Sequence, residues 1–227
     1  MTRVGALVAL ILAASASEDR PRPLFDGRTL AGWTVVGGKA GNWRAEGAEV
    51  VCLGLGKDWI GTNREYGDFA LSLEYRLGPA GNSGVLLRSP RKGDPSFAGL
   101  EVQLLDDDAP AYRGLHPWQY TGSVYGVAAA RRGAARKAGE WNSLEVRLEG
   151  SRIVVRLNGT VVLDDDLARH PEALPKHPGI GRPRGLIGLQ SHGDPARFRN
   201  LAIRGLGPRA GEGSPEGLGP DPGHPSR

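Results

Sequence analysis

Cysteine is nearly absent from this chain of 227 residues, because Cys52 is its only one. A single cysteine excludes any internal disulfide, so the burial of apolar side chains has to stabilise the fold. Cys52 lies within the apolar run Val50–Leu53, and this setting predicts a buried, inert thiol.

Long hydrophobic runs are also missing after the first few residues. An apolar segment begins at Val4, follows the positive Arg3 and ends at the small-residue pattern Ala14-Ser15-Ala16. This order is typical of a secretory signal peptide, here residues 1–16, and the segment is too short to span a bilayer. Because no cysteine stands at the cleavage site, a lipoprotein anchor is excluded. We expect a secreted or periplasmic protein with no membrane span after leader removal.

Several common chemistries are excluded by missing motifs. The chain has no Gly-x-Ser-x-Gly elbow, phosphate loop, His-Glu-x-x-His or Cys-x-x-Cys. Only His192, among five histidines, lies in a strand pattern beside other polar groups, which argues against a dedicated zinc cage. The net charge is +4, and the most basic run, residues 131–137, contains no aromatic residue. We therefore expect no nucleic-acid partner, since such sites combine positive charge with stacking rings.

Glycine and proline are abundant, with 35 and 17 copies, and they separate many short apolar or alternating runs. This pattern predicts many strands joined by tight turns. The expected strands span residues 42–44, 50–53, 70–77, 84–88, 100–105, 143–149, 152–157, 160–163, 186–191 and 198–204.

The connections between these runs indicate the fold class. The expected strands at 152–157 and 160–163 are separated by only two residues, Asn158-Gly159. This pair favours the positive φ angles of a type I′ hairpin turn. A short helix is expected at Leu167–Ala173, capped by the preceding aspartates. No longer helical stripe follows the leader. We predict an all-β, antiparallel two-sheet jelly-roll sandwich.

Composition also sets the domain limits. Residues 207–227 form a glycine- and proline-rich tail with a single large apolar residue, which cannot offset the entropy of folding. We predict a leader at 1–16, one sandwich domain at 23–206 and a disordered tail at 207–227.

Strand alternation places polar side chains together on one face. Glu101 and Gln103 point away from Leu100, Val102 and Leu104, because side chains alternate along a strand. By the same reasoning, Gln190 and His192 share one face of the run 186–192. Such residues hydrogen-bond sugar hydroxyls, and Glu and His also move protons near neutral pH.

Two further strands add polar groups by the same alternation. Arg88 lies opposite Val85 and Leu87, and Glu74 lies opposite Leu73 and Tyr75. Ordinary solvated faces of antiparallel sheets produce this pattern as well. The selection of Glu, Gln, Arg and His favours a site, provided that the strands converge.

Two clusters remain open to more than one interpretation. Trp118, Tyr120 and Tyr125 fall in the loop-rich segment 114–126, which could wall a sugar cleft. The triplet at residues 106–108, three consecutive aspartates, could hold a divalent cation such as calcium, although a simple turn explains it equally well. The sequence identifies no certain cofactor, metal requirement or oligomeric state.

A series of short motifs resembles the 3-keto-disaccharide hydrolase domain family over about residues 23–206. The opening Leu24–Trp33 is similar to the family's Phe-Asn/Asp-Gly-x-x-Leu-x-Gly-Trp signature. The other matching blocks, in order, are Tyr66–Phe69 with Glu74, Gly81–Val85 with Arg88, Leu100–Gln103, Gly139–Asn142, Asn158-Gly159, Gly188–Gly193 and Phe198–Asn200. One departure is Ser191, which replaces an aspartate before the His-Gly pair.

The resemblance implies a concanavalin-like or glucanase-like jelly roll that acts on glycosides already oxidised at C3. A 3-keto group acidifies the C2 hydrogen, so a base removes that proton, the C1 substituent leaves with help from an acid, and water adds. The carbohydrate would be a 3-keto-glycoside or 3-keto-disaccharide.

Within this scheme Glu101 and His192 are the catalytic pair, and the sequence leaves open which is the base. The expected substrate-binding residues are Arg88, Gln103, Gln190, Glu74, Asn82 and Tyr125. A non-catalytic lectin-like module would use the same fold and face, and a secreted sandwich for protein contacts would scatter these polar groups. If Glu101 and His192 line one cavity, the enzyme and the lectin-like module are both favoured over the sandwich for protein contacts.

Overall fold

The computed structural model describes residues 20–38 and 41–207. The predicted leader at 1–16 and residues 208–227 of the predicted tail lie outside this range. None of the described helices is long and apolar enough to cross a membrane.

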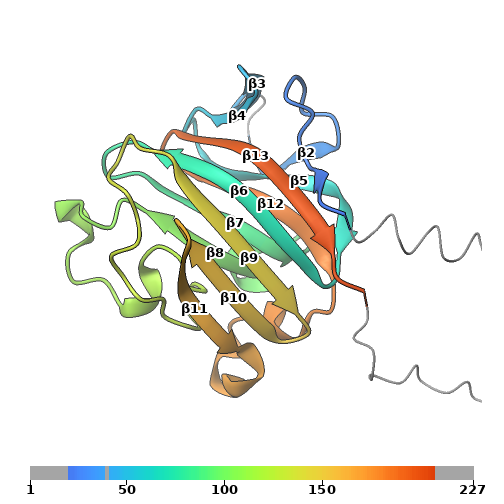
Figure 1. Ribbon diagram of the computed structural model, residues 1–227, viewed down its shortest axis with the longest axis vertical. Helices are drawn as coiled ribbons and strands as arrows, with labels where there is room; N and C mark the ends of the chain where they lie inside the picture. Colours follow the sequence, from blue (N-terminus) through green and yellow to red (C-terminus); the bar gives the residue numbers. More distant parts are fainter. Residues whose placement is uncertain (1–19, 39–40, 208–227) are drawn as a thin grey trace, which may run out of the picture.

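Two antiparallel sheets form a sandwich, as Figure 1 shows, and this confirms the predicted all-β fold class. Sheet A is eight-stranded and contains β1 (Arg22–Pro23), β3 (Trp43–Glu46), β4 (Glu49–Cys52), β6 (Phe69–Leu77), β9 (Asn142–Glu149), β10 (Arg152–Leu157), β11 (Thr160–Asp166) and β13 (Ala196–Gly205). Sheet B is five-stranded and contains β2 (Trp33–Val36), β5 (Lys57–Tyr66), β7 (Asn82–Ser89), β8 (Leu100–Leu105) and β12 (Gly185–His192).

The strand order brings distant parts of the chain together. Sheet A runs β11-β10-β9-β6-β13-β4-β3, with β1 on β13, and sheet B runs β2-β5-β12-β7-β8. The remaining elements are one α-helical turn, α2 (Pro95–Ala98), and the short 3-10 helices η1 (Pro110–Tyr112), η2 (Pro117–Gln119), η3 (Leu167–Arg169), η4 (Pro171–Ala173) and η5 (Pro178–Gly181).

The core lies between the two sheets and follows strand alternation. In β6 the odd-numbered residues Leu71, Leu73 and Tyr75 are at most 3% exposed, and Val85 and Leu87 face them from sheet B. Burial of these apolar faces is the main stabilising contribution in the absence of a disulfide. In sheet B the alternate residues consequently point to its outer face, namely the even-numbered residues of β12 and the odd-numbered residues of β8.

Several local predictions are confirmed. Cys52 is a buried free thiol. Asn158 and Gly159 both have positive φ angles, 49° and 82°, as a type I′ turn requires. The expected helix at 167–173 is instead two successive 3-10 turns, η3 and η4, because Pro171 starts a new turn there.

The sequence pattern does not predict β2 and β5. In β5 the expected alternation is interrupted by Gly61 and by the exposed polar run 63–65. The Trp59 ring lies over Gly61 and over Gly188 of β12, and a Cβ on either glycine would collide with that ring. Glycine is therefore required where this indole crosses the outer face of sheet B.

Arg88 does not lie on the face that alternation predicts, and it is buried away from the residues that line the cavity described below. A register shift in the pairing of β7 with β12 precedes it, and Arg88 itself has a φ of +47°. A bulge of this kind redirects the side chain. The buried guanidinium binds Asp68 at 2.7 Å and donates to the carbonyls of Gly67, Gly150 and Arg182 at 3.2, 2.8 and 3.1 Å.

Glu74 is also placed away from the other candidates. It lies on β6 of sheet A, where its carboxylate accepts a 2.6 Å bond from Arg199. Alternation correctly turns Glu74 away from the core, but the side chain faces outward from the opposite sheet. The structure therefore does not bring Glu74 together with the candidates on sheet B.

We expect Arg88→Ala to lower the free energy of unfolding by about 2–4 kcal/mol, because it removes the donor of three carbonyls and the ion-pair partner of Asp68. Urea denaturation measures this change. Arg113→Ala, which removes an exposed arginine, is the control and should change stability by less than about 0.5 kcal/mol. Equal stability of the two variants would contradict the structural role of Arg88.

Candidate active site

A cavity of about 790 Å³ lies on the outer face of sheet B, between that sheet, α2 and the segment that follows β8. Its volume is within the range of small-molecule sites. Six of the eight residues predicted for the site line it: Glu101, His192, Gln103, Gln190, Asn82 and Tyr125. The cavity therefore gathers both predicted catalytic residues, which come from β8 and β12.

The pairing of three adjacent strands explains this convergence. Gly84 of β7 pairs with Gln190 of β12 on one side and with Gln103 of β8 on the other. The Glu101 side chain packs over Gly84, where any Cβ would collide with the carboxyl group. The missing side chain of Gly84 thus makes the room in which Glu101 lies.

Glu101 is a buried carboxyl group, with only 3% of its surface exposed. Burial raises its pKa to about 7, and the negative charge of Asp94 acts in the same direction. Hydrogen bonds from Ser96 and Gln190 oppose this rise, because they stabilise the ionised form. Glu101 is consequently poised to hold or release a proton near neutral pH.

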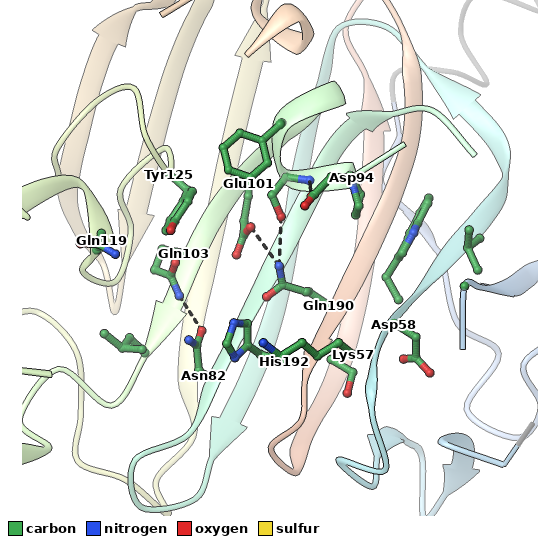
Figure 2. Close-up of a pocket in the computed structure, with 18 of the residues that line it drawn as sticks. Lys57, Asp58, Asn82, Asp94, Glu101, Gln103, Gln119, Tyr125, Gln190 and His192 are labelled. Atoms are coloured by element: carbon green, nitrogen blue, oxygen red, sulfur yellow. Dashed lines mark hydrogen bonds between the residues drawn. The ribbon is translucent and has the colours of Figure 1, made fainter. Parts of the chain in front are cut away.

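Gln190 connects Glu101 to α2. Its Nε2 donates to Glu101 Oε2 at 3.0 Å and to Ser96 Oγ at 3.1 Å (Figure 2). Ser96 is held by the N-cap of α2, where Asp94 accepts a 2.9 Å bond from its backbone amide. The Gln190 Oε1 atom is buried and has no hydrogen-bond partner among the described residues. Gln190 is thus fixed mainly by its contacts with Glu101 and Ser96.

A second amide pair lines the cavity beside Glu101. Gln103 Nε2 donates to Asn82 Oδ1 at 2.9 Å and to the Ser83 carbonyl at 3.2 Å. Figure 2 shows Tyr125 beside Gln103, with both side chains directed into the cavity. These groups can recognise sugar hydroxyls through paired hydrogen bonds.

His192 lies at the exposed rim, opposite Lys57 in the β12–β5 pairing. Partial burial lowers the pKa of the His192 ring, and the positive charge of Lys57 lowers it further, while Asp194 opposes the change. The imidazole is therefore mainly neutral at pH 7 and able to accept a proton. Lys57 adds a positive charge to the same side of the cavity.

Sequence analysis missed the residues contributed by β5 and α2. Lys57, Asp58 and Trp59 line the cavity from β5, and Ser96 and Phe97 line it from α2. One available signal was the Asp-Pro pair at 94–95, a common helix start. The contacts of Ser96 carry no comparable signal, because they depend on strands far away in the sequence.

The predicted aromatic wall is only partly present. Tyr125 lines the cavity, whereas Tyr120 is buried and donates to the Tyr112 carbonyl at 2.9 Å. Trp118 packs edge-on against Tyr125, with ring centroids 5.1 Å apart. Trp118 therefore supports Tyr125 from behind.

The aspartates at 106–108 stabilise the local turn. Asp106 accepts from the Ala80 amide, and Asp107 accepts from both the amide and the hydroxyl of Thr121. Within residues 20–38 and 41–207, no cluster of three or more His, Cys, Asp or Glu side chains is arranged to hold a metal ion. The turn interpretation of this triplet accounts for the contacts observed.

Solved structures show where else this fold occurs. Two candidate glycosyl hydrolases from Parabacteroides distasonis superpose with TM-scores of 0.73 and 0.72 at 29% and 26% identity. The first alignment covers 82% of this chain and 100% of that protein, and the second covers 85% and 96%. A carbohydrate-binding module of Bacillus subtilis shares the fold, with a TM-score of 0.53 at 17% identity over 79% of this chain and 99% of the module.

Sequence comparison assigns the chain more narrowly. A Bacteroides thetaiotaomicron protein named 3-keto-disaccharide hydrolase is 25% identical over 224 residues, which cover 81% of this chain and 77% of that protein. Residues 20–204 match the family model described as the 3-keto-alpha-glucoside-1,2-lyase-like domain. This range includes every strand that lines the cavity. The chain belongs to the 3-keto-alpha-glucoside-1,2-lyase-like domain family.

Proposed function

We propose that this protein cleaves 3-keto-glycosides by removing the C2 proton and expelling the C1 substituent. The observation that carries the proposal is the shared cavity of Glu101, with a pKa raised to about 7, and His192, with a lowered pKa. Two titratable groups with pKa values moved in opposite directions are typical of an acid and a base acting on one substrate.

The directions of the two pKa changes favour one division of the roles. Near pH 7 His192 is mainly neutral, so it accepts the C2 proton as the base. Glu101 retains a substantial protonated fraction, so it donates a proton to the oxygen that leaves from C1. The opposite assignment would need ionised Glu101 and protonated His192 at once, which is a minor state near neutral pH.

The electron pair of the C2–H bond moves onto the 3-keto oxygen and forms an enolate. That pair then returns to form the C1=C2 double bond, while the C1–O bond breaks and Glu101 protonates the departing oxygen. Lys57, paired across the strands with His192, supplies positive charge for the enolate oxygen.

Water completes the net hydrolysis. Ionised Glu101 takes a proton from water as the hydroxyl adds to C1, and protonated His192 returns a proton to C2. Both residues thereby regain their starting protonation states. The amides of Asn82, Gln103 and Gln190 hold the sugar hydroxyls through this sequence.

The direct test compares a 3-keto-glucoside with the same glucoside in unoxidised form, by chromatography of the released C1 substituent. Release only from the oxidised compound supports the proposal, because only that compound has an acidic C2 hydrogen. A lectin-like module would retain both sugars without consuming either, and that outcome would reject catalysis.

We expect Glu101→Gln to lower kcat/KM about 10²- to 10⁴-fold for an alkyl 3-keto-glucoside, because the leaving alcohol then lacks its proton donor. For a 4-nitrophenyl 3-keto-glucoside the loss should be much smaller, since that leaving group departs without protonation. His192→Ala should impair both substrates.

Glu145→Gln on the exposed face of sheet A is the matched control and should retain full activity. If Glu101→Gln reduced turnover of both substrates equally, the acid role would be wrong.

We expect kcat/KM to be bell-shaped in pH. Activity should rise as pH passes the lowered pKa of His192, below 6.5, and fall above about pH 7 as Glu101 ionises. Gln190→Leu removes a hydrogen bond that stabilises ionised Glu101, so the pKa rises and the alkaline limb moves to higher pH.

Gln103→Leu is the control, because it removes an amide from the same cavity that makes no bond to Glu101. It should lower activity without moving the alkaline limb. If the alkaline limb of the pH profile stayed in place in Gln190→Leu, that limb would not report the ionisation of Glu101.

A further inference from the structure

We propose that one end of the cavity is a subsite for an aromatic aglycone, formed by Phe97, Tyr125 and Leu115. This inference rests on the proposed function, because it concerns the group that leaves from C1. It specifies the substrate class as aryl or arylalkyl 3-keto-glycosides.

One end of the cavity is distinguished by a pair of packed aromatic rings. Towards β5, the lining includes the charged side chains of Lys57 and Asp58. Around α2 and the segment that follows β8, it includes the aromatic pair Phe97 and Tyr125 together with Leu115, and Asp94 and Arg91 line the cavity beside α2. The polar residues Glu101, Gln103 and Gln190 lie between the ends, on β8 and β12. The sugar ring therefore fits the centre, and the apolar end is left for another part of the substrate.

Phe97 is the clearest sign of a binding surface at this end. It is 38% exposed although it lines the cavity, and leaving so large an apolar ring in contact with water is unfavourable. Its ring stands edge-to-face with Tyr125, at 6.2 Å between centroids and 86° between planes. The His177 ring also packs against it, with 5.0 Å between ring centroids. The ring is thus held in position before a ligand arrives.

Two polar atoms near this end are already engaged within the protein. The Tyr112 hydroxyl donates to the Ala80 carbonyl at 2.7 Å, and Gln119 Oε1 accepts from the His116 amide at 3.0 Å. These two atoms do not serve the hydroxyls of a second sugar without breaking their internal bonds, and each unpaired hydroxyl costs binding free energy. An aromatic ring needs no such partners and gains edge-to-face contacts.

The position of the proton donor supports the same assignment. The Tyr125 amide donates to the Glu101 carbonyl at 2.9 Å, so the backbone that carries the acid also carries the aromatic wall. In the proposed reaction the leaving oxygen must lie beside the Glu101 carboxyl. The group attached to that oxygen is thereby directed towards Tyr125 and Phe97.

The experiment compares 3-keto-glucosides of benzyl alcohol, methanol and glucose with the same anomeric configuration. All three leaving groups are ordinary alcohols, so differences reflect binding more than leaving-group ability. We expect KM for the benzyl compound to be about tenfold below that of the other two. Phe97→Ala and, separately, Leu115→Ala should raise the benzyl KM several-fold and leave the disaccharide KM within about twofold.

Leu55→Ala is the matched control, because it removes an exposed apolar side chain that does not line the cavity. A parallel calorimetric titration uses unreactive benzyl and methyl glucosides, so the subsite is tested even without turnover. If none of the 3-keto-glucosides is consumed but benzyl glucoside binds tighter than methyl glucoside, the subsite stands and the catalytic proposal fails. If the benzyl and methyl compounds bind alike, or the disaccharide has the lowest KM, the subsite is overturned.

Discussion

The burial of one carboxyl group organises the candidate active site. Glu101 lies over Gly84, beneath α2 and against Gln190, and each of these contacts comes from a different part of the chain. Removing a carboxylate from water is costly, and the site offsets this cost in part with two hydrogen bonds. The balance leaves Glu101 with a pKa of about 7, where a carboxyl group can donate and recover a proton in one cycle.

The sandwich supports this arrangement because the two faces of sheet B have different roles: the inward face packs in the core, and the outward face carries the candidate site. Inward residues of sheet B, such as Val85 and Leu87, pack into the core, so outward residues are free to be Glu, Gln, Asn and His. Buried Arg88 ties the loops at one end of the sandwich through Asp68 and three carbonyls. The outer face of sheet B can therefore hold polar groups, a glycine and a flat indole without weakening the core. The family match and the amide-rich lining of the cavity both support the proposed carbohydrate ligand.

Strand alternation predicted much of the fold and the centre of the site. It correctly grouped Glu101 with Gln103 and Gln190 with His192, because these runs are regular strands of one sheet. It failed at Arg88, where a residue in the left-handed region breaks the alternation. It also failed at Glu74, since alternation distinguishes inward from outward but does not assign a strand to a sheet.

The missed residues share a different cause. Lys57 lies in a strand whose pattern is broken by glycine, and Ser96 lies in a single helical turn too short to show periodicity. Both are placed in the site by contacts with distant strands, which local sequence patterns do not reveal. The assignment of base and acid likewise depends on burial and on neighbouring charge, both of which are tertiary properties.

The central claim is that the C1 bond breaks only after the C2 proton has been removed. The most direct measurement is turnover of a 3-keto-glucoside in D₂O, followed at early times by NMR of the released 3-keto sugar. His192 is exposed, so its acquired proton exchanges with solvent before it returns to C2. The account predicts one deuterium at C2 for each substrate molecule consumed. A product that retains hydrogen at C2 would mean direct displacement at C1 and would contradict it.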